Sequence, residues 1–271
     1  MKKNFHTVWI VLLSIIVFGS FFAPFIAQHS PYEVELSKVL QKPNGTYIMG
    51  TDAMGRDIFA RIIYGGRVSL SVGFFSVIIS TVIGIIYGGI SGYFGGKLDN
   101  YMMRLLDTFL AIPTLIIMLA LQAIIRGGLV SIILVIGCTS WLATARIVRS
   151  QFSELRDKNF VKAAIVIGTP TWKILINHIL KNSMPAIVVI ATLNCAQSIF
   201  MEVSMSFLGI GVPQGTPSWG NMLTNAQSDI LSGAWWVAVF PGVTIVIAML
   251  CINFIGEYLK KKVTYVQISN V

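Results

Sequence analysis

The sequence has little charge. Only 11% of its 271 residues are Asp, Glu, Lys or Arg, whereas a soluble domain has about 25%. Hydrophobic residues make up 55%, and the mean hydropathy is +0.77. A soluble domain of this length cannot bury so much apolar surface. The composition therefore excludes a soluble enzyme and, despite the net charge of +9, a nucleic-acid-binding domain. It also excludes disorder, which needs low hydrophobicity and high charge.

The sequence also lacks the motifs of catalysis and metal binding. Its three cysteines lie in apolar runs without a CxxC partner, which is typical of small packed hydrophobic residues. It contains no GxSxG and no HExxH. The nearest candidate for a P-loop, SGYFGGKL, has Ser91 and Leu98 where glycine and Ser/Thr are needed. We therefore predict that the chain is not an enzyme and holds no metal or cofactor.

Long apolar runs are what the sequence has in abundance. A bilayer core of about 30 Å needs about 20 apolar residues in a helix. Six stretches come near this length, and they predict an all-α membrane protein with six transmembrane helices. Residues 1–67 are expected to form an N-terminal anchor helix, not a cleaved signal, and an extracytoplasmic segment. Residues 68–258 would form the core and residues 259–271 a tail. The expected spans are residues 8–27, 68–93, 105–125, 129–145, 186–207 and 235–255.

The distribution of Lys and Arg predicts the orientation. With the N-terminus in the cytoplasm, fourteen of these residues fall in inside segments and six in outside segments. Cytoplasmic loops carry the excess of positive charge. We therefore expect a multi-pass protein of the cell membrane with both termini in the cytoplasm.

Small residues recur at every fourth position in the second predicted span. This spacing places them on one helix face, where a neighbouring backbone can approach closely. An internal packing seam is the favoured interpretation; a surface that contacts a second subunit is the alternative. The residues are Ser76, Ser80, Gly84, Gly88 and Gly92.

Two acidic residues fall at membrane depth, where ionisable groups are costly and mark candidate functional positions. Asp107 follows Arg104 by three residues, so an ion pair on one helix face is expected. Glu202 has no partner that the sequence reveals. It would either line an aqueous path or reach the outer interface.

The cytoplasmic loop at about residues 147–185 is the most informative segment. FVKAAIVI predicts a short helix, Gly168-Thr169-Pro170 a turn, and Thr171–Leu180 a second helix. A compact helix–turn–helix between two spans indicates a docking element. The alternative is an ordinary solvated basic loop.

This loop resembles that of the inner-membrane permeases of ABC importers, whose mark is Glu-Ala-Ala, three residues, and then Gly. Here Lys162-Ala163-Ala164 precedes Gly168, so a lysine replaces the family's glutamate. A second departure is Lys181, where the family often has proline. The resemblance is closest to the second permease of dipeptide, oligopeptide and nickel importers, and it covers about residues 50–258. Three further stretches support it, GTDAMGRDIFARIIYGGRVSLSVG from Gly50, GYFGGKLDNYMMRLLDTFLAIPTL and SMSFLGIGVPQGTPSWGNML.

The resemblance implies a type I ABC importer permease that pairs with a second, similar permease in the lipid bilayer. Two cytoplasmic ATPase subunits would bind ATP and Mg, and an extracytoplasmic binding protein would deliver the solute. The leading solute is a peptide, with nickel or a metal chelate as the alternative. An ion-driven secondary transporter is a remote alternative, and a channel or structural subunit is another class. The implied coupling residues are Asp157, Phe160, Lys162, Ala163, Ala164, Gly168, Trp172 and His178, and the implied outer signature is Gly50, Thr51, Asp52, Gly55, Arg56 and Asp57.

Overall fold

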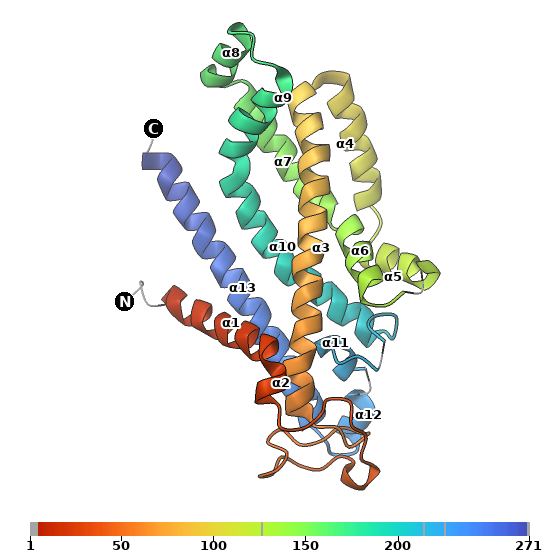
Figure 1. Cartoon of the computed structure of the whole chain (residues 1–271). Coiled ribbons are helices and arrows are strands. Elements are labelled where there is room, and N and C mark those ends of the chain that lie inside the picture. Colours follow the sequence, from red (N-terminus) through yellow and green to blue (C-terminus); the bar gives the residue numbers. More distant parts are fainter. Residues whose placement is uncertain (1–4, 126, 214, 225, 270–271) are drawn as a thin grey trace.

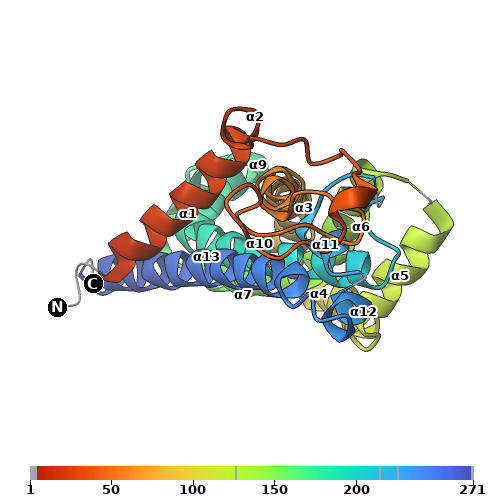
Figure 2. The ribbon, with the colours of Figure 1, turned by 90° about the horizontal axis from the view of Figure 1, so that it is seen from below.

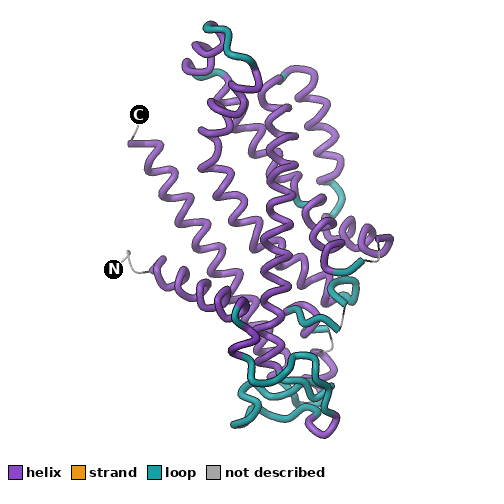
Figure 3. Tube along the Cα trace, viewed as in Figure 1, coloured by secondary structure: helices purple, strands orange, loops and turns teal. Residues whose placement is uncertain are grey.

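The computed structural model describes residues 5–125, 127–213, 215–224 and 226–269, which form helices joined by loops (Figures 1 and 3). This confirms the all-α prediction. One end of the molecule carries α8, here named the α8 end; the other carries residues 27–57 and α12, here named the loop end. The elements are α1 (Phe5–Phe21), α2 (Ala23–Ile26), the turn η1 (Leu36–Lys38), α3 (Ile58–Phe94), α4 (Gly96–Leu110), α5 (Thr114–Ile125), α6 (Leu129–Thr139), α7 (Trp141–Arg156), α8 (Asn159–Val166), α9 (Thr171–Lys173), the π-helix η2 (Ile174–Leu180), α10 (Lys181–Phe207), α11 (Trp219–Met222), α12 (Ala226–Leu231) and α13 (Trp236–Ser269).

Helix α3 is the central element. Its 37 residues span about 55 Å at 1.5 Å per residue. The Asp57 side chain caps its start by accepting a hydrogen bond from the Phe59 backbone N–H at 3.1 Å. Helices α1, α6, α7 and α10 pack around it (Figures 1 and 2). The helix begins before the predicted span, so residues 58–67 are helical and do not belong to the loop segment.

The predicted span at residues 105–125 is interrupted. Helices α4 and α5 replace it, and they are inclined by 80° to each other. Pro113 lies in the break between them. Proline has no backbone N–H and disfavours helical geometry at the preceding residue, here Ile112, so the helix stops. The segment is a bent pair of helices.

The predicted span at residues 129–145 is divided at Ser140. Helix α6 ends at Thr139, and α7 starts at Trp141 and continues to Arg156. Leu129–Arg156 still counts as one apolar stretch of 28 residues. Helix α7 therefore extends well beyond the apolar run and forms the first part of the predicted cytoplasmic loop.

The number of uninterrupted spans is smaller than the six predicted. Within the described ranges, four helical stretches are long and apolar enough to cross a bilayer, and the bent α4–α5 pair makes a possible fifth. The N-terminal apolar helix, His6–Phe21, is shorter than 18 residues. It ends before the Pro24 region, where α2 starts a separate turn. The four stretches are Ile58–Phe94, Leu129–Arg156, Thr171–Phe207 and Trp236–Lys262.

The small-residue face of α3 lies against α7. A Cβ built on Gly84 would lie 2.7 Å from Thr144 Cγ2, and one on Gly88 or Gly92 would overlap a backbone carbonyl oxygen of α7. Such close backbone approach is what small residues permit. Ser76 and Ser80 on the same face are fully buried. The stripe therefore belongs to a seam inside the chain and is not open to a second subunit.

Candidate coupling site

Helix α8 projects from the end of the bundle between α7 and α9 (Figure 1). It begins after Lys158, whose backbone is extended, and has eight residues. The second helix of the predicted helix–turn–helix starts at Thr171 as expected. It does not end at Leu180, because α9, η2 and α10 run on as one helical stretch from Thr171 to Phe207.

The turn after α8 depends on Gly168. Its φ of +83° lies in the left-handed region, which favours glycine. Gly168 N–H donates to Ile165 O at 3.0 Å, and Thr169 N–H donates to Ala164 O at 3.0 Å. These two bonds form a Schellman motif, which satisfies the last carbonyl groups of the helix. Pro170 follows and prevents the helix from continuing.

One face of α8 is anchored to the bundle. Val161 is fully buried and Ala164 is 7% exposed. They belong to one hydrophobic cluster with Phe152 of α7 and with Ile174 and Ile179 of η2. The second alanine of the Ala-Ala pair therefore packs inward, whereas Ala163 and Lys162 point to the surface.

The other face of α8 exposes apolar side chains. Val166 is 87% exposed and Ile167 is 82% exposed. Contiguous exposed apolar surface marks interaction sites in proteins. Asp157, which follows α7, is exposed, with Arg156 Nε 3.3 Å from its Oδ1, and His178 is half-buried. We name the exposed set the coupling patch; it consists of Phe160, Ile165, Val166, Ile167 and Trp172.

Polar contacts tie the α8 end of α7 to its neighbours. Arg149 forms a bidentate pair with Asp99 of α4, with Nε 2.9 Å from Oδ1. Bidentate guanidinium–carboxylate pairs fix relative orientation. Arg156 Nη1 donates to Tyr93 O at the end of α3 at 3.1 Å. Together with the glycine seam, these contacts tie α3, α4 and α7 to one another.

The signature residues at the loop end form a closed turn. Gly50 and Gly55 have φ of +76° and +74°. Asp52 accepts hydrogen bonds from the backbone N–H groups of Met54 at 2.8 Å and Arg56 at 3.0 Å, and its Oδ2 lies 2.7 Å from Arg56 Nε. Thr51 is fully buried, and its carbonyl accepts a bond from Trp236 Nε1 at 3.1 Å. These residues hold the loop end on α13.

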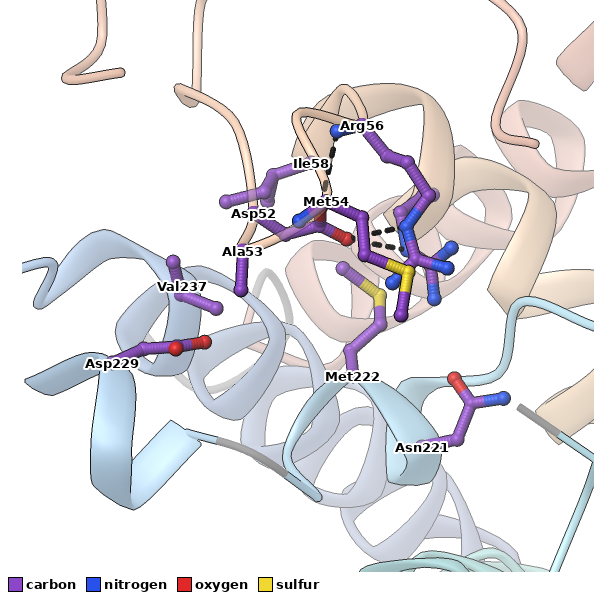
Figure 4. A pocket seen from close by; sticks show the side chains of 10 residues that line it. Asp52, Ala53, Met54, Arg56, Ile58, Asn221, Met222, Asp229 and Val237 are labelled. Carbon is purple, nitrogen blue, oxygen red and sulfur yellow. Dashed lines mark hydrogen bonds and ion pairs between the residues drawn. The ribbon is translucent and has the colours of Figure 1, made fainter. Parts of the chain in front are cut away.

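A small pocket of about 50 Å³ opens beside this turn (Figure 4). Asp52, Arg61 and Asp229 line it together with Asn221 and Met222. Asp229 is 6% exposed. Burial, and then the neighbouring Asp52 carboxylate, raise the pKa of Asp229 above its usual value. The pocket joins the signature turn to α11 and α12.

Residues 47–265 match the family described as "Binding-protein-dependent transport system inner membrane component". The chain belongs to this family. The permease is 37% identical to the dipeptide transport system permease protein DppC of Bacillus subtilis, over 96% of this chain and 82% of that protein. It is 40% identical to a putative peptide permease protein of Brucella suis, over 93% of this chain and 83% of that protein. It is 37% identical to the oligopeptide transport system permease protein OppC of Haemophilus influenzae, over 93% of this chain and 81% of that protein.

A solved structure shares the fold of this permease. It is the inward-facing MetNI methionine ABC transporter, with a TM-score of 0.62 and 19% identity, covering 75% of this chain and 96% of that chain. At this identity the likeness supports the fold alone. With the family match, it confirms the predicted type I permease architecture and places the chain among multi-pass inner-membrane transport components.

The expectations for Glu202 of the permease are wrong in this structure. Glu202 is fully buried and neither lines an open path nor reaches an interface. Ser69 Oγ donates to its Oε2 and Ser206 Oγ to its Oε1, both at 2.9 Å. Trp219 N–H in turn donates to Ser69 Oγ at 3.2 Å. Glu202 therefore joins α3, α10 and α11. Ser206 at i+4 was the one signal in the sequence; Ser69 is distant along the chain.

The predicted Arg104–Asp107 pair is also wrong. Asp107 forms its ion pair with Arg146 of α7, and both side chains are more than half exposed. Arg104 is exposed and makes no ion pair with a described residue. The fold brings α4 beside α7, a proximity that spacing along the sequence does not reveal. In the part of the chain that the structure describes, no three His, Cys, Asp or Glu side chains gather as metal ligands.

Proposed function

We propose that this chain is the permease subunit of an ABC importer for dipeptides and oligopeptides, and that it forms half of the translocation pathway. The relatives named as dipeptide and oligopeptide permeases support the solute class. The coupling patch on α8 is the observation that carries the mechanism, because it is an apolar surface at the tip of a short, anchored helix.

In this proposal the α8 end lies in the cytoplasm, where the coupling patch enters a cleft of one ATPase subunit. Burial of apolar area supplies the binding free energy. ATP and Mg bind to the two ATPase subunits, and this chain performs no chemistry itself. Closure of the ATPase pair would displace α8 and, through the tied unit of α3, α4 and α7, switch the pathway between inward-open and outward-open states.

The remaining partners follow from the same proposal. A second, homologous permease completes the pathway, and an extracytoplasmic binding protein delivers peptide to the loop end. Both termini then lie in the cytoplasm, in agreement with the distribution of Lys and Arg. Lys162, which replaces the family's glutamate, is exposed on α8 and offers a positive charge to the ATPase.

Reconstitution of the complete complex in liposomes tests this function. The chain, the second permease, both ATPases and the binding protein are co-purified, and uptake of radiolabelled dialanine, trialanine and Ni²⁺ is measured with and without ATP. ATP-dependent peptide uptake that requires the binding protein is the expected result. Uptake of Ni²⁺ without peptide uptake would contradict the solute class, and failure of the ATPases to co-purify would contradict the importer itself.

A further inference from the structure

Helix α10 has a polar side chain at its centre. Asn194 is the middle residue of Lys181–Phe207, with thirteen residues on each side. Each half is about 20 Å long at 1.5 Å per residue. In a helix that crosses the bilayer, Asn194 and the neighbouring Gln197 therefore lie close to the midplane, where a polar side chain needs a polar partner or water.

Two hollows lie on different faces of α10, and the second has more polar side chains in its lining than the first. The first is a groove of about 580 Å³ between α10, α1, α3 and α13. Leu13, Phe74, Val188 and Ile252 are typical of its lining. Thr192 also lines it, but its hydroxyl is bonded to Val188 O of its own helix at 2.8 Å. This face of α10 suits hydrocarbon.

The second hollow has both polar and apolar side chains in its lining. It has a volume of about 150 Å³ and lies between α10, the α4–α5 bend and the α6–α7 junction. Non-helical backbone at membrane depth is tolerated only where it is buried in protein or lines a water-filled cavity. The α4–α5 bend and the α6–α7 junction are two such interruptions, and residues next to each of them line this hollow. Its polar lining is Thr114, Thr139, Ser140, Asn194 and Gln197.

Several of these polar groups have unused hydrogen-bonding capacity. Gln197 is exposed, and its amide has no hydrogen bond to a described residue. The same holds for the hydroxyl groups of Thr114 and Ser140 across the parts of the chain that the structure describes. Asn194 Nδ2 donates to Thr144 Oγ1 at 2.9 Å, which leaves its Oδ1 available. A face with this many open donors and acceptors does not suit lipid.

We propose that this polar face lines the solute path and hydrogen-bonds the backbone of an extended peptide in transit; the proposal rests on the function proposed above. A side-chain amide offers both an N–H donor and a carbonyl acceptor, which match a peptide's own C=O and N–H whatever its side chains. None of the ten residues lining the hollow is charged. Neutral contacts let a solute enter and also leave.

Two charged residues that are close in sequence to the lining do not line the hollow themselves. Asp107 and Arg146 each lie three residues from a lining residue, Leu110 and Ala143 respectively, and they pair with each other. Their mutual pairing neutralises the field at the α8 side of the hollow. The face of α10 that carries Gln197 is therefore a polar, uncharged section of the solute path.

Cysteine accessibility tests where this face points. In the reconstituted complex, with Cys138, Cys195 and Cys251 replaced by alanine, Gln197→Cys is compared with Thr192→Cys on the apolar groove. We expect a charged, water-soluble methanethiosulfonate reagent to modify the cysteine at 197 at least tenfold faster, and trialanine under turnover to slow that reaction. Equal rates at the two positions, or no reaction at 197, would overturn the proposal.

Transport measurements separate recognition from structure. Gln197→Leu removes the amide and is expected to lower trialanine uptake at least fivefold at unchanged abundance and basal ATPase rate, with Gln197→Asn restoring most of it. Thr192→Val is the matched control and should stay within twofold of wild type. Normal uptake by Gln197→Leu would overturn this inference while the proposed function stands. A wild-type complex that takes up no peptide would overturn both.

Discussion

Substitution of Gly168 separates coupling from folding. The residue has φ of +83°, and a Cβ built on it meets nothing within 4 Å. The cost of a side chain is therefore backbone strain alone, about 1–2 kcal/mol for an L-residue in the left-handed region. Valine adds branching at Cβ, which is especially unfavourable there. This cost lowers the ratio of the native turn to its non-native conformations about 5- to 30-fold.

The expected result of Gly168→Val is a permease that inserts and assembles normally but transports poorly. The strained turn would release the Schellman motif and misplace the coupling patch against the ATPase. Peptide uptake should fall, by up to about 30-fold, and ATPase activity should no longer respond to loaded binding protein. Gly168→Asn should stay near wild type, because asparagine tolerates positive φ.

Gly233→Val is the matched control. Gly233 has φ of +85° and an equally open surrounding, but it lies between α12 and α13 at the loop end. It should carry the same backbone cost without loss of ATPase association. Uptake assays, immunoblots of membrane abundance and co-purification of the ATPase measure the series. Normal uptake by Gly168→Val at normal abundance would refute the docking role of α8.

Three further substitutions test other parts of the structure. Gly88→Leu should reduce membrane abundance or assembly several-fold, because its side chain overlaps Ala145 O. Gly242→Leu, which has no atom near its Cβ, should not reduce them. Equal immunoblot levels of the two variants would contradict the packing seam between α3 and α7. Glu202→Gln should keep transport, since an amide can form hydrogen bonds with both Ser69 and Ser206. Glu202→Ala should lower membrane abundance. Loss of uptake by the glutamine variant at normal abundance would mean that the charge itself is needed. In a chain without native cysteines, single cysteines at Ser153 and Lys261 should react with a thiol reagent only from the cytoplasm. A single cysteine at Thr216 should react only from outside. Labelling of position 153 from outside intact cells would reverse the orientation.

Local patterns in the sequence predicted local structure well. The Ala-Ala pair, Gly168 and Pro170 carry enough information to place a short helix and its end, because the turn chemistry is contained within a few residues. The recurrence of glycine at every fourth position, Gly84, Gly88 and Gly92, likewise predicted a packing face of the helix. Hydrophobicity placed the helices but not their interruptions, since Pro113 lies inside a run that is apolar on both sides.

Partners distant along the chain were not predictable. Asp107 pairs with Arg146, 39 residues away, and Glu202 with Ser69, 133 residues away. Sequence spacing indicates only helical neighbours at i+3 and i+4. It therefore favoured Arg104 as the partner of Asp107 and left Glu202 without a partner. The polar face at Gln197 was missed for the same reason, because α5, α6 and α10 meet there only in the folded bundle.

Photo-crosslinking from the tip of α8 tests the central claim most directly. Benzoylphenylalanine is placed at Val166 or, as the control, at Phe25; both side chains are 87% exposed, but they lie at opposite ends of the molecule. In the purified complex, irradiation should link position 166 to an ATPase subunit and position 25 to neither ATPase. Absence of an ATPase adduct at 166, or equal adducts at both positions, would contradict the account.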